Sequence, residues 1–212
     1  MIIEALHKHF IKSSGICTDT RSINNNCLFF ALKGANFNGN TFANNALKKG
    51  AYKVIIDEKE FLNDHSILVH NVLETLQELA TFHRDYLKIP IIALTGSNGK
   101  TTTKELINAV LSKKYKTVAT KGNLNNHIGV PLTLLAMNSN TEIGIVEMGA
   151  NHHKEIELLC EIAKPDYGYI TNFGKAHLEG FGSLEGVIEA KTEMYRYLKS
   201  KKNTVFINFN DK

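Results

Sequence analysis

The residues best suited to chemistry form a short loop rich in glycine and hydroxyl side chains. It follows the apolar run Ile91 to Leu94 and reads T-G-S-N-G-K-T-T. Glycines let backbone N–H groups approach phosphate oxygens, and a helix that begins after the loop points its positive end at them. Lys100 could reach the β- and γ-phosphates, and the Thr101 hydroxyl could hold Mg²⁺. The predicted ATP-binding residues are Gly96, Ser97, Asn98, Gly99, Lys100, Thr101 and Thr102.

The spacing of this loop differs from the general form G-x-x-x-x-G-K-[ST], because Leu94 stands where that form has its first glycine. The alternative is an ordinary turn between a strand and a helix, in which the glycines serve only the turn. That alternative leaves Lys100 and the threonines after it unexplained. We therefore favour a phosphate loop.

Two residues could join the loop at one edge of a sheet. Glu147 ends the apolar run Ile143 to Met148, and a carboxylate at the carboxyl end of a parallel strand is placed to hold Mg²⁺. The alternative is a surface glutamate, but Gly149 lets the chain turn sharply there and favours the metal role. His177 follows the predicted strand Tyr167 to Thr171, although a lone loop histidine is usually solvated.

Lys191 falls in the middle of the apolar stripe of a predicted helix, Leu184 to Leu198, at about 100° per residue. A lysine on a buried face must pair, reach solvent or lose its charge. One solution is a carbamate formed with CO₂, which is an anionic metal ligand; the other is a lysine that reaches solvent or pairs with Glu179. The residues alone do not choose between them. The expected solvent face carries Glu185, Glu189, Glu193 and Arg196.

Two polar stretches could bind a substrate. Gly122 to Pro131 is dense in glycine and asparagine, and its amides offer donors and acceptors, although the residues alone favour a turn-rich connector. In the first part of the chain, Arg21 could bind a phosphate with two hydrogen bonds. The alternative is an exposed turn, and the residues alone leave both open.

The pattern of apolar runs, which predicts the strands and helices that position these residues, changes near Pro90. After it, short apolar strands alternate with helices, which predicts a mostly parallel, doubly wound sheet wrapped by helices. The expected strands are Ile91 to Leu94, Lys116 to Thr120, Ile143 to Met148, Tyr167 to Thr171 and Thr204 to Asn208, and the expected helices are Thr101 to Ser112, Glu155 to Ala163 and Leu184 to Leu198.

Before Pro90 the apolar runs are shorter and predict a small mixed α/β domain. Thr41 is placed to cap one helix, and Gly50 to take the left-handed position after it. The overall expectation is an α/β protein with domains over residues 1–87 and 88–212. The expected elements of the first domain are strands Ile16 to Thr18, Cys27 to Leu32 and Tyr52 to Ile56, and helices Thr41 to Lys49 and Asn71 to Leu87.

Composition excludes several classes. Lys plus Arg total 25 against 21 for Asp plus Glu, and no basic stripe or aromatic platform suggests nucleic-acid binding. The sequence has no run of eighteen apolar residues, so it predicts no membrane-spanning helix. The first ten residues do not resemble a secretory signal. The three cysteines lack metal-ligand spacing and are typical of reduced thiols in a cytoplasmic protein. We expect a monomer.

The shortened loop T-G-S-N-G-K-T-T resembles that of the Mur ligases, the ATP-dependent amide-forming enzymes of peptidoglycan precursor synthesis, and of their folylpolyglutamate synthetase relatives. The resemblance covers essentially the whole chain, in order. It is greatest to the members that join D-Ala-D-Ala to UDP-MurNAc-tripeptide, through G-N-L-N-N-H-I-G-V-P, V-E-M-G-A-N, A-H-L-E-G-F-G-S and E-A-K-T-E. One departure is F-N-G-N, with Asn38 and Asn40, where many relatives have F-D-G-H.

The resemblance implies a role for each candidate residue. Thr101 and Glu147 would hold a first Mg²⁺, His177 a second, and Lys191 would match the family's carbamylated lysine, which favours the carbamate at that position. Lys100, His177 and Lys191 would be catalytic. The implied substrate contacts are Asn125 and Asn126 at the muramoyl peptide, and Thr20, Arg21, Asn36 and Phe37 around the UDP moiety.

The implied reaction has two steps. The peptide carboxylate attacks the γ-phosphorus of ATP to give an acyl phosphate, and the D-Ala-D-Ala amine then displaces phosphate. The family's third, C-terminal domain has no counterpart here, and the chain stops directly after a strand, so we expect residues 1–212 alone to have little or no ligase activity. The alternatives are a related ligase that adds a different amino acid, a nucleotide-binding module without turnover and, less favoured, a P-loop kinase.

Overall fold

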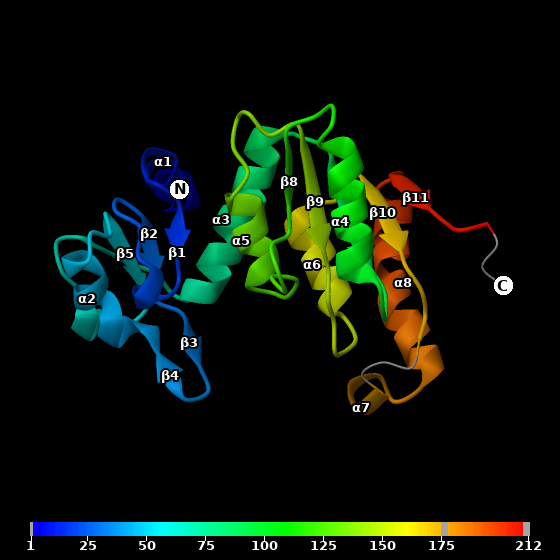
Figure 1. The fold of residues 1–212 in the computed structure, drawn as a ribbon. Helices are drawn as coiled ribbons and strands as arrows, with labels where there is room; N and C mark the ends of the chain where they lie inside the picture. The colour runs from blue at the N-terminus through cyan, green and yellow to red at the C-terminus, as the bar shows by residue number, and fades with distance from the viewer. Residues whose placement is uncertain (1, 175–177, 210–212) are drawn as a thin grey trace. The chain divides into compact units, whose positions relative to one another are not determined.

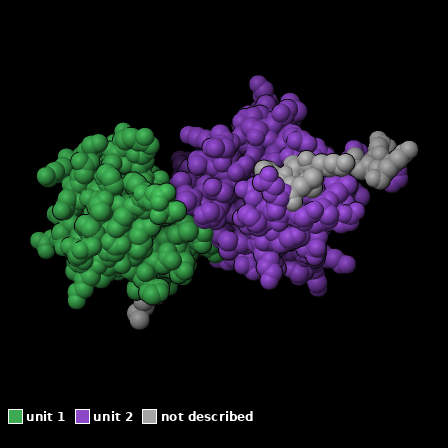
Figure 2. All heavy atoms as spheres, turned by 90° about the horizontal axis from the view of Figure 1, so that it is seen from below, with its two compact units in different colours: residues 1–83 green, residues 84–212 purple. Residues whose placement is uncertain are grey.

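A computed structural model describes residues 2–174 and 178–209. The chain forms two compact units, residues 1–83 and 84–212, which are coloured separately in Figure 2. The division falls inside helix α3 (Val72–Leu87), whereas the sequence places the domain boundary at the end of that helix. The boundary between functional domains after Leu87 stays a prediction.

The first unit contains a four-stranded parallel sheet in the order β1-β2-β5-β6. Strand β2 is buried on both faces, as its unbroken apolar run predicts. A small antiparallel pair, β3 with β4, lies outside this sheet. The elements of this unit are α1 (Ile2–Lys12), β1 (Ile16–Cys17), η1 (Thr20–Ser22), β2 (Leu28–Phe30), β3 (Lys33–Gly34), β4 (Phe37–Asn38), η2 (Gly39–Phe42), α2 (Ala43–Lys48), β5 (Lys53–Ile56), η3 (Lys59–Phe61), β6 (Ser66–Leu68) and most of α3.

The three strands predicted in this unit are confirmed, and one helix start is wrong. Thr41 does not cap α2, because its hydroxyl donates to the carbonyl of Asn38 at 2.8 Å within the 3₁₀ turn η2. Gly50 does adopt the left-handed conformation, with φ of 102°. Helix α1 and strand β6 were not predicted.

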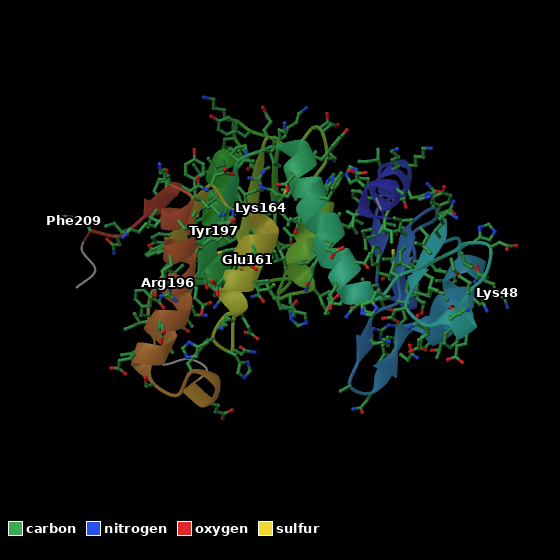
Figure 3. The ribbon with its side chains drawn as sticks, turned by 180° about the vertical axis from the view of Figure 1, so that it is seen from behind. Lys48, Glu161, Lys164, Arg196, Tyr197 and Phe209 are labelled. Atoms are coloured by element: carbon green, nitrogen blue, oxygen red, sulfur yellow. The ribbon has the colours of Figure 1, made fainter. Side chains whose placement is uncertain are left out.

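The second unit is a five-stranded sheet whose neighbouring strands are all parallel, in the order β11-β10-β7-β9-β8. Helix α4 covers one face, and α6 and α8 cover the other (Figures 1 and 3). The predicted doubly wound α/β fold is confirmed. The elements are β7 (Ile91–Thr95), α4 (Lys100–Leu111), β8 (Thr117–Ala119), α5 (Gly129–Leu135), β9 (Ile143–Glu147), α6 (Glu155–Ala163), β10 (Tyr167–Ile170), α7 (Leu178–Phe181), α8 (Leu184–Ser200) and β11 (Thr204–Phe206).

This strand order places the loop after β7 and Glu147 at the same edge of the sheet, where the strands have their carboxyl ends. Strands β7 and β9 are neighbours, and their register pairs Leu94 with Glu147. The phosphate loop after β7 and the carboxylate at the end of β9 therefore leave the sheet side by side. Within the described residues, no helix is long and apolar enough to cross a membrane.

Candidate active site

The loop between β7 and α4 depends on two glycines. Gly96 has φ of 145°, and a Cβ there would lie 2.0 Å from the hydroxyl oxygen of Thr171. Gly99 has φ of 74° and stands at the N-cap of α4, so the helix begins at Lys100. Both conformations favour glycine, since L side chains rarely adopt them. The N-terminus of α4 is thus directed at the space that the loop surrounds.

The segment after β10 holds this loop in place. The Ser97 hydroxyl donates to the carbonyl of Gly174 at 3.0 Å, and the Asn98 N–H donates to the side-chain oxygen of Asn172 at 3.0 Å. The Thr171 hydroxyl donates to the carbonyl of Asn98 at 2.6 Å. Thr171 and Asn172 were not among the predicted site residues; the signal that could have identified them is their position at the end of a parallel strand, at the same edge of the sheet.

Lys100 lies across the loop that precedes it. Its ammonium donates to the carbonyls of Gly96 at 2.8 Å and Ser97 at 3.2 Å. Burial lowers the pKa of Lys100, and the nearby carboxylate of Glu147 partly offsets that effect. A cation is therefore held where the loop would receive phosphate oxygens.

The Glu147 carboxylate is buried, with 1% of the residue exposed. One oxygen accepts a hydrogen bond from the Thr101 hydroxyl at 3.0 Å, and the other accepts one from the Asn125 amide at 2.7 Å. Among the described residues no cation lies within ion-pair distance of it. A buried charge with only neutral donors is costly. The carboxylate and the hydroxyl thus fit a bound cation.

The chemistry of these donors favours Mg²⁺. Across the part of the chain that the structure describes, no three His, Cys, Asp or Glu side chains gather, so a site whose ligands all come from such side chains is absent there. Mg²⁺ commonly takes only one or two carboxylates from the protein and completes its shell with phosphate oxygens and water. Thr101 and Glu147 beside a phosphate loop match that preference.

Lys191 is also buried, with 1% exposed, so its predicted place on the inner face of α8 is confirmed. Its nitrogen makes a long hydrogen bond to the carbonyl of Ala150, at 3.4 Å, and lies 5.4 Å from the ring centre of Phe181. Burial, followed by repulsion from Lys100, lowers the pKa of Lys191 to about 8. In the described structure it neither reaches solvent nor pairs with Glu179. Its carbamylation stays a prediction.

The opposite face of α8 differs from expectation at one residue. Glu193 was predicted to face solvent, but it is buried, and its carboxylate accepts the N–H groups of Lys154 at 2.7 Å and Glu157 at 3.0 Å. A carboxylate at a helix N-terminus satisfies free N–H groups and favours the helix dipole, and here it caps α6. A contact between two helices reversed the orientation that periodicity assigned to Glu193.

Hydrogen bonds hold the asparagine-rich stretch, Gly122 to Pro131, beside the Glu147 carboxylate. The backbone carbonyl of Asn125 accepts the N–H of Gly149 at 2.7 Å. The Asn126 side chain accepts the N–H groups of Ile128 at 3.1 Å and Gly129 at 2.9 Å, and so caps α5. Helix α5 was not predicted, since the stretch before it resembles a connector.

A cavity of about 310 Å³ opens between this stretch and α6. Glu155 contributes a charge to its wall, and its carboxylate accepts the N–H groups of Asn151 at 2.6 Å and His152 at 3.1 Å. Burial raises the pKa of Glu155, but these hydrogen bonds outweigh burial and lower it. The lining includes Lys100, Asn125, Asn126, Gly149, Asn151 and Glu155.

Of the remaining predicted residues, Thr102 is exposed in the first turn of α4, and His177 lies outside the described residues. In the first unit, Thr20 and Arg21 form part of η1. The Arg21 side chain is 89% exposed, and its guanidinium binds Asp19, with Nη2 2.6 Å and Nε 2.9 Å from Oδ2.

Asn36 and Phe37 lie at the β3–β4 turn of the first unit. Asn36 is exposed, and Phe37 stacks on Phe42 with ring centres 5.3 Å apart. The two asparagines that depart from the common pattern serve the local fold. Asn40 is buried and donates to Asp57 at 2.9 Å, and Asn38 donates to Glu58 at 2.8 Å.

Comparisons with known proteins identify the family of the chain. Residues 12–93 match the catalytic domain of the Mur ligase family, and residues 94–212 match the Mur ligase middle domain. UDP-N-acetylmuramoyl-tripeptide–D-alanyl-D-alanine ligase of Bacillus subtilis is 44% identical over 196 residues, which cover 91% of this chain and 43% of that protein. The ligase of the same name from Escherichia coli is 40% identical over 185 residues, covering 87% and 41%.

Solved structures of Mur ligases are also similar to this chain. MurF ligase from Thermotoga maritima in complex with ADP superposes with a TM-score of 0.85 at 34% identity, covering 95% of this chain and 47% of that one. MurF from Acinetobacter baumannii superposes with a TM-score of 0.80 at 36% identity, covering 86% and 40%. The chain spans less than half the length of these relatives.

Proposed function

Because this chain belongs to the Mur ligase family, we propose that it is part of an ATP-dependent ligase that joins D-Ala-D-Ala to UDP-MurNAc-tripeptide. The observation that carries the proposal is the buried Glu147 carboxylate, held by Thr101 directly beside a phosphate loop. The names and the 40–44% identities of the Bacillus and Escherichia relatives support the choice of substrates. The ADP complex of the Thermotoga relative supports ATP at the loop.

In the first step, an oxygen of the tripeptide's terminal carboxylate attacks the γ-phosphorus of ATP. The bond to the bridging oxygen breaks, ADP leaves and an acyl phosphate forms. The chain contributes electrostatics and alignment, since Lys100 and the N-terminus of α4 stabilise charge on the phosphate oxygens. Asn125 and Asn126, which line the cavity beside Lys100, would orient the peptide.

In the second step, the amine of D-Ala-D-Ala attacks the acyl carbon. Phosphate leaves with the bonding electrons, the amine loses a proton, and an amide remains. A free carboxylate would be a poor acyl donor, since oxide is a poor leaving group. The chain's share is to keep the acyl phosphate in the cavity between the asparagine-rich stretch and α6.

We assign two Mg²⁺ ions to the site, which would supply charge neutralisation at the phosphates. Thr101 and Glu147 would hold the first. His177 and Lys191 would hold the second, once the Lys191 amine has formed a C–N bond with CO₂ and lost a proton to become a carbamate. The lowered pKa of Lys191, about 8, leaves a useful fraction of the amine neutral for that reaction.

Residues 1–87 would bind the UDP moiety through Thr20, Arg21, Asn36 and Phe37, and residues 88–212 would bind ATP. Arg21 would exchange Asp19 for a diphosphate oxygen, a contact that its exposure permits. The three free cysteines are buried, which suits a reducing compartment, and we assign the reaction to a monomer in the cytoplasm. Its product would serve cell-wall synthesis, cell shape and cell division.

The test is a phosphate-release assay on the whole protein with UDP-MurNAc-tripeptide, ATP and a panel of amines. We expect turnover with D-Ala-D-Ala and not with single amino acids. Lys100→Ala should abolish turnover while leaving the protein folded. Turnover with another amine alone would assign a different ligase, and ATP binding without turnover would leave only a nucleotide-binding module.

A further inference from the structure

A second fully buried lysine, Lys104, lies one turn after Thr101 on α4, and the reaction described above does not use it. None of its surface is exposed. Its ammonium donates to the carbonyl of Thr120 at 2.6 Å and pairs with Glu105 at 2.7 Å, although Glu105 is itself 62% exposed. A buried ammonium is costly unless its hydrogen bonds are well formed, so this contact fixes Thr120 against α4.

Thr120 in turn holds the backbone of Glu147. It directly follows β8, and its hydroxyl oxygen accepts the N–H of Glu147 at 2.9 Å. Its own N–H donates to the carbonyl of Ile145 at 2.9 Å, on the same strand as Glu147. Any movement of Thr120 therefore moves the end of β9 from which the carboxylate projects.

Helix α4 thus reaches Glu147 by two routes. Thr101 binds the carboxylate directly, and Lys104, three residues later on the same helix face, reaches the Glu147 N–H through Thr120. Asn125, five residues after Thr120, donates to the remaining carboxylate oxygen. Two of these four contacts hold the Glu147 carboxylate, one holds its backbone N–H, and the contact from Lys104 to Thr120 ties that backbone to α4.

We propose that Lys104 is a positioning residue that sets the place of the Glu147 carboxylate, and through it the affinity of the site for a divalent cation. This inference rests on the proposed cation role of Glu147. Within the described residues, the hydrogen bond and the ion pair of this ammonium go to Thr120 and Glu105, so its effect on Glu147 passes through Thr120. Groups that orient a metal ligand typically change metal affinity about 10- to 100-fold when they are removed.

The experiment measures how strongly Mg²⁺ tightens binding of a fluorescent ADP analogue to the whole protein, as the ratio of the dissociation constants without and with Mg²⁺. Lys104→Met keeps length and volume but removes the donor and the charge. We expect this ratio to fall about tenfold or more, with little change in the affinity without Mg²⁺. The matched control is Lys113→Met, an exposed lysine just beyond α4, which should leave the ratio unchanged.

A pair of Thr120 variants tests whether the effect of Lys104 passes through Thr120. Thr120→Val should reproduce the loss and Thr120→Ser should retain the ratio, because serine keeps the hydroxyl that accepts the Glu147 N–H. If Lys104→Met does not fold, Thr120→Val decides the outcome, because it removes the hydroxyl through which Lys104 reaches the Glu147 N–H. A wild-type ratio in the folded Lys104 variant, or in Thr120→Val, overturns the inference.

Glu147→Gln tests the premise separately. If this variant loses the Mg²⁺ effect while the Lys104 variant keeps it, the inference about Lys104 fails and the proposed function stands. If Glu147→Gln keeps the full Mg²⁺ effect, the proposed cation site itself is wrong.

Discussion

Lys104 on α4 and Lys191 on α8 are both buried in the second unit, yet their surroundings differ. Lys104 makes a 2.6 Å hydrogen bond to a carbonyl and an ion pair at 2.7 Å. Lys191 has one long hydrogen bond of 3.4 Å and an aromatic ring, and its pKa is lowered to about 8. Burial alone therefore does not identify a reactive lysine. The partners decide whether the amine stays a structural cation or becomes a nucleophile.

The largest expected effect separates these two lysines by activity. Lys191→Met should lower the turnover of the whole protein by about 10²- to 10³-fold, the usual loss when an electrostatic contributor to the transition state is removed. Lys104→Met should cost less than about tenfold at saturating Mg²⁺, because excess metal offsets a weaker site. Phosphate release measures both, and equal losses would mean that the two lysines do not differ in role.

Carbamylation offers a direct readout of the same difference. With ¹³C-bicarbonate, we expect one slowly exchanging carbamate resonance in the wild-type chain. It should disappear in Lys191→Met and persist in Lys104→Met, since the buried Lys191 amine has only a long hydrogen bond of 3.4 Å, whereas Lys104 has a carbonyl at 2.6 Å and a carboxylate at 2.7 Å. A resonance that survives in Lys191→Met would place the modification elsewhere.

The sequence predicts Lys191 better than Lys104, for a physical reason. Lys191 interrupts an apolar stripe, so periodicity alone places it inside, as it does Val187 and Leu198. On α4 the pattern misleads: Leu106 and Val110 are exposed, while Lys104 is the residue that packs against the sheet. Tertiary contacts set that orientation, and no local periodicity encodes them.

Across the whole site, some features follow from local sequence patterns and others depend on tertiary contacts. The phosphate loop, the parallel sheet and the position of Glu147 follow from local patterns, because strand, glycine turn and helix succeed one another along the chain. The burial of Glu193 and the bracing of the loop by Thr171 and Asn172 join segments far apart in sequence. Such partners become visible only in the folded chain.

Stability should change in opposite directions at the two lysines. Lys104→Met leaves the Thr120 carbonyl without its donor and should lower the free energy of unfolding by about 1–3 kcal/mol. Lys191→Met removes an amine that is poorly compensated, and replacing such a group by an apolar side chain is often neutral or stabilising by about 1–4 kcal/mol. Urea unfolding in the absence of CO₂ measures both changes, and destabilisation by Lys191→Met would contradict the interpretation of a weakly partnered amine.

Lys191 should also make stability depend on pH. Its pKa of about 8 in the folded chain lies below the value of about 10.4 for an unfolded lysine. Between these values the unfolded chain binds a proton that the folded chain has released, so the stability contributed by this residue rises with pH across the window and is lost below it. The difference in urea midpoint between wild type and Lys191→Met should follow this trend, and a difference that stays constant across the window would contradict it.

The smallest expected effect concerns which partner of Lys104 matters more. Glu105 is largely exposed, so water screens its ion pair, and Glu105→Ala should change the free energy of unfolding by about 1 kcal/mol or less. The Mg²⁺ effect on ADP binding should stay near wild type, because the hydrogen bond from Lys104 to Thr120 remains. A large fall in that Mg²⁺ effect would show that the ammonium is placed by Glu105. The position of the Lys104 ammonium would then be set by Glu105 and not by its hydrogen bond to the Thr120 carbonyl.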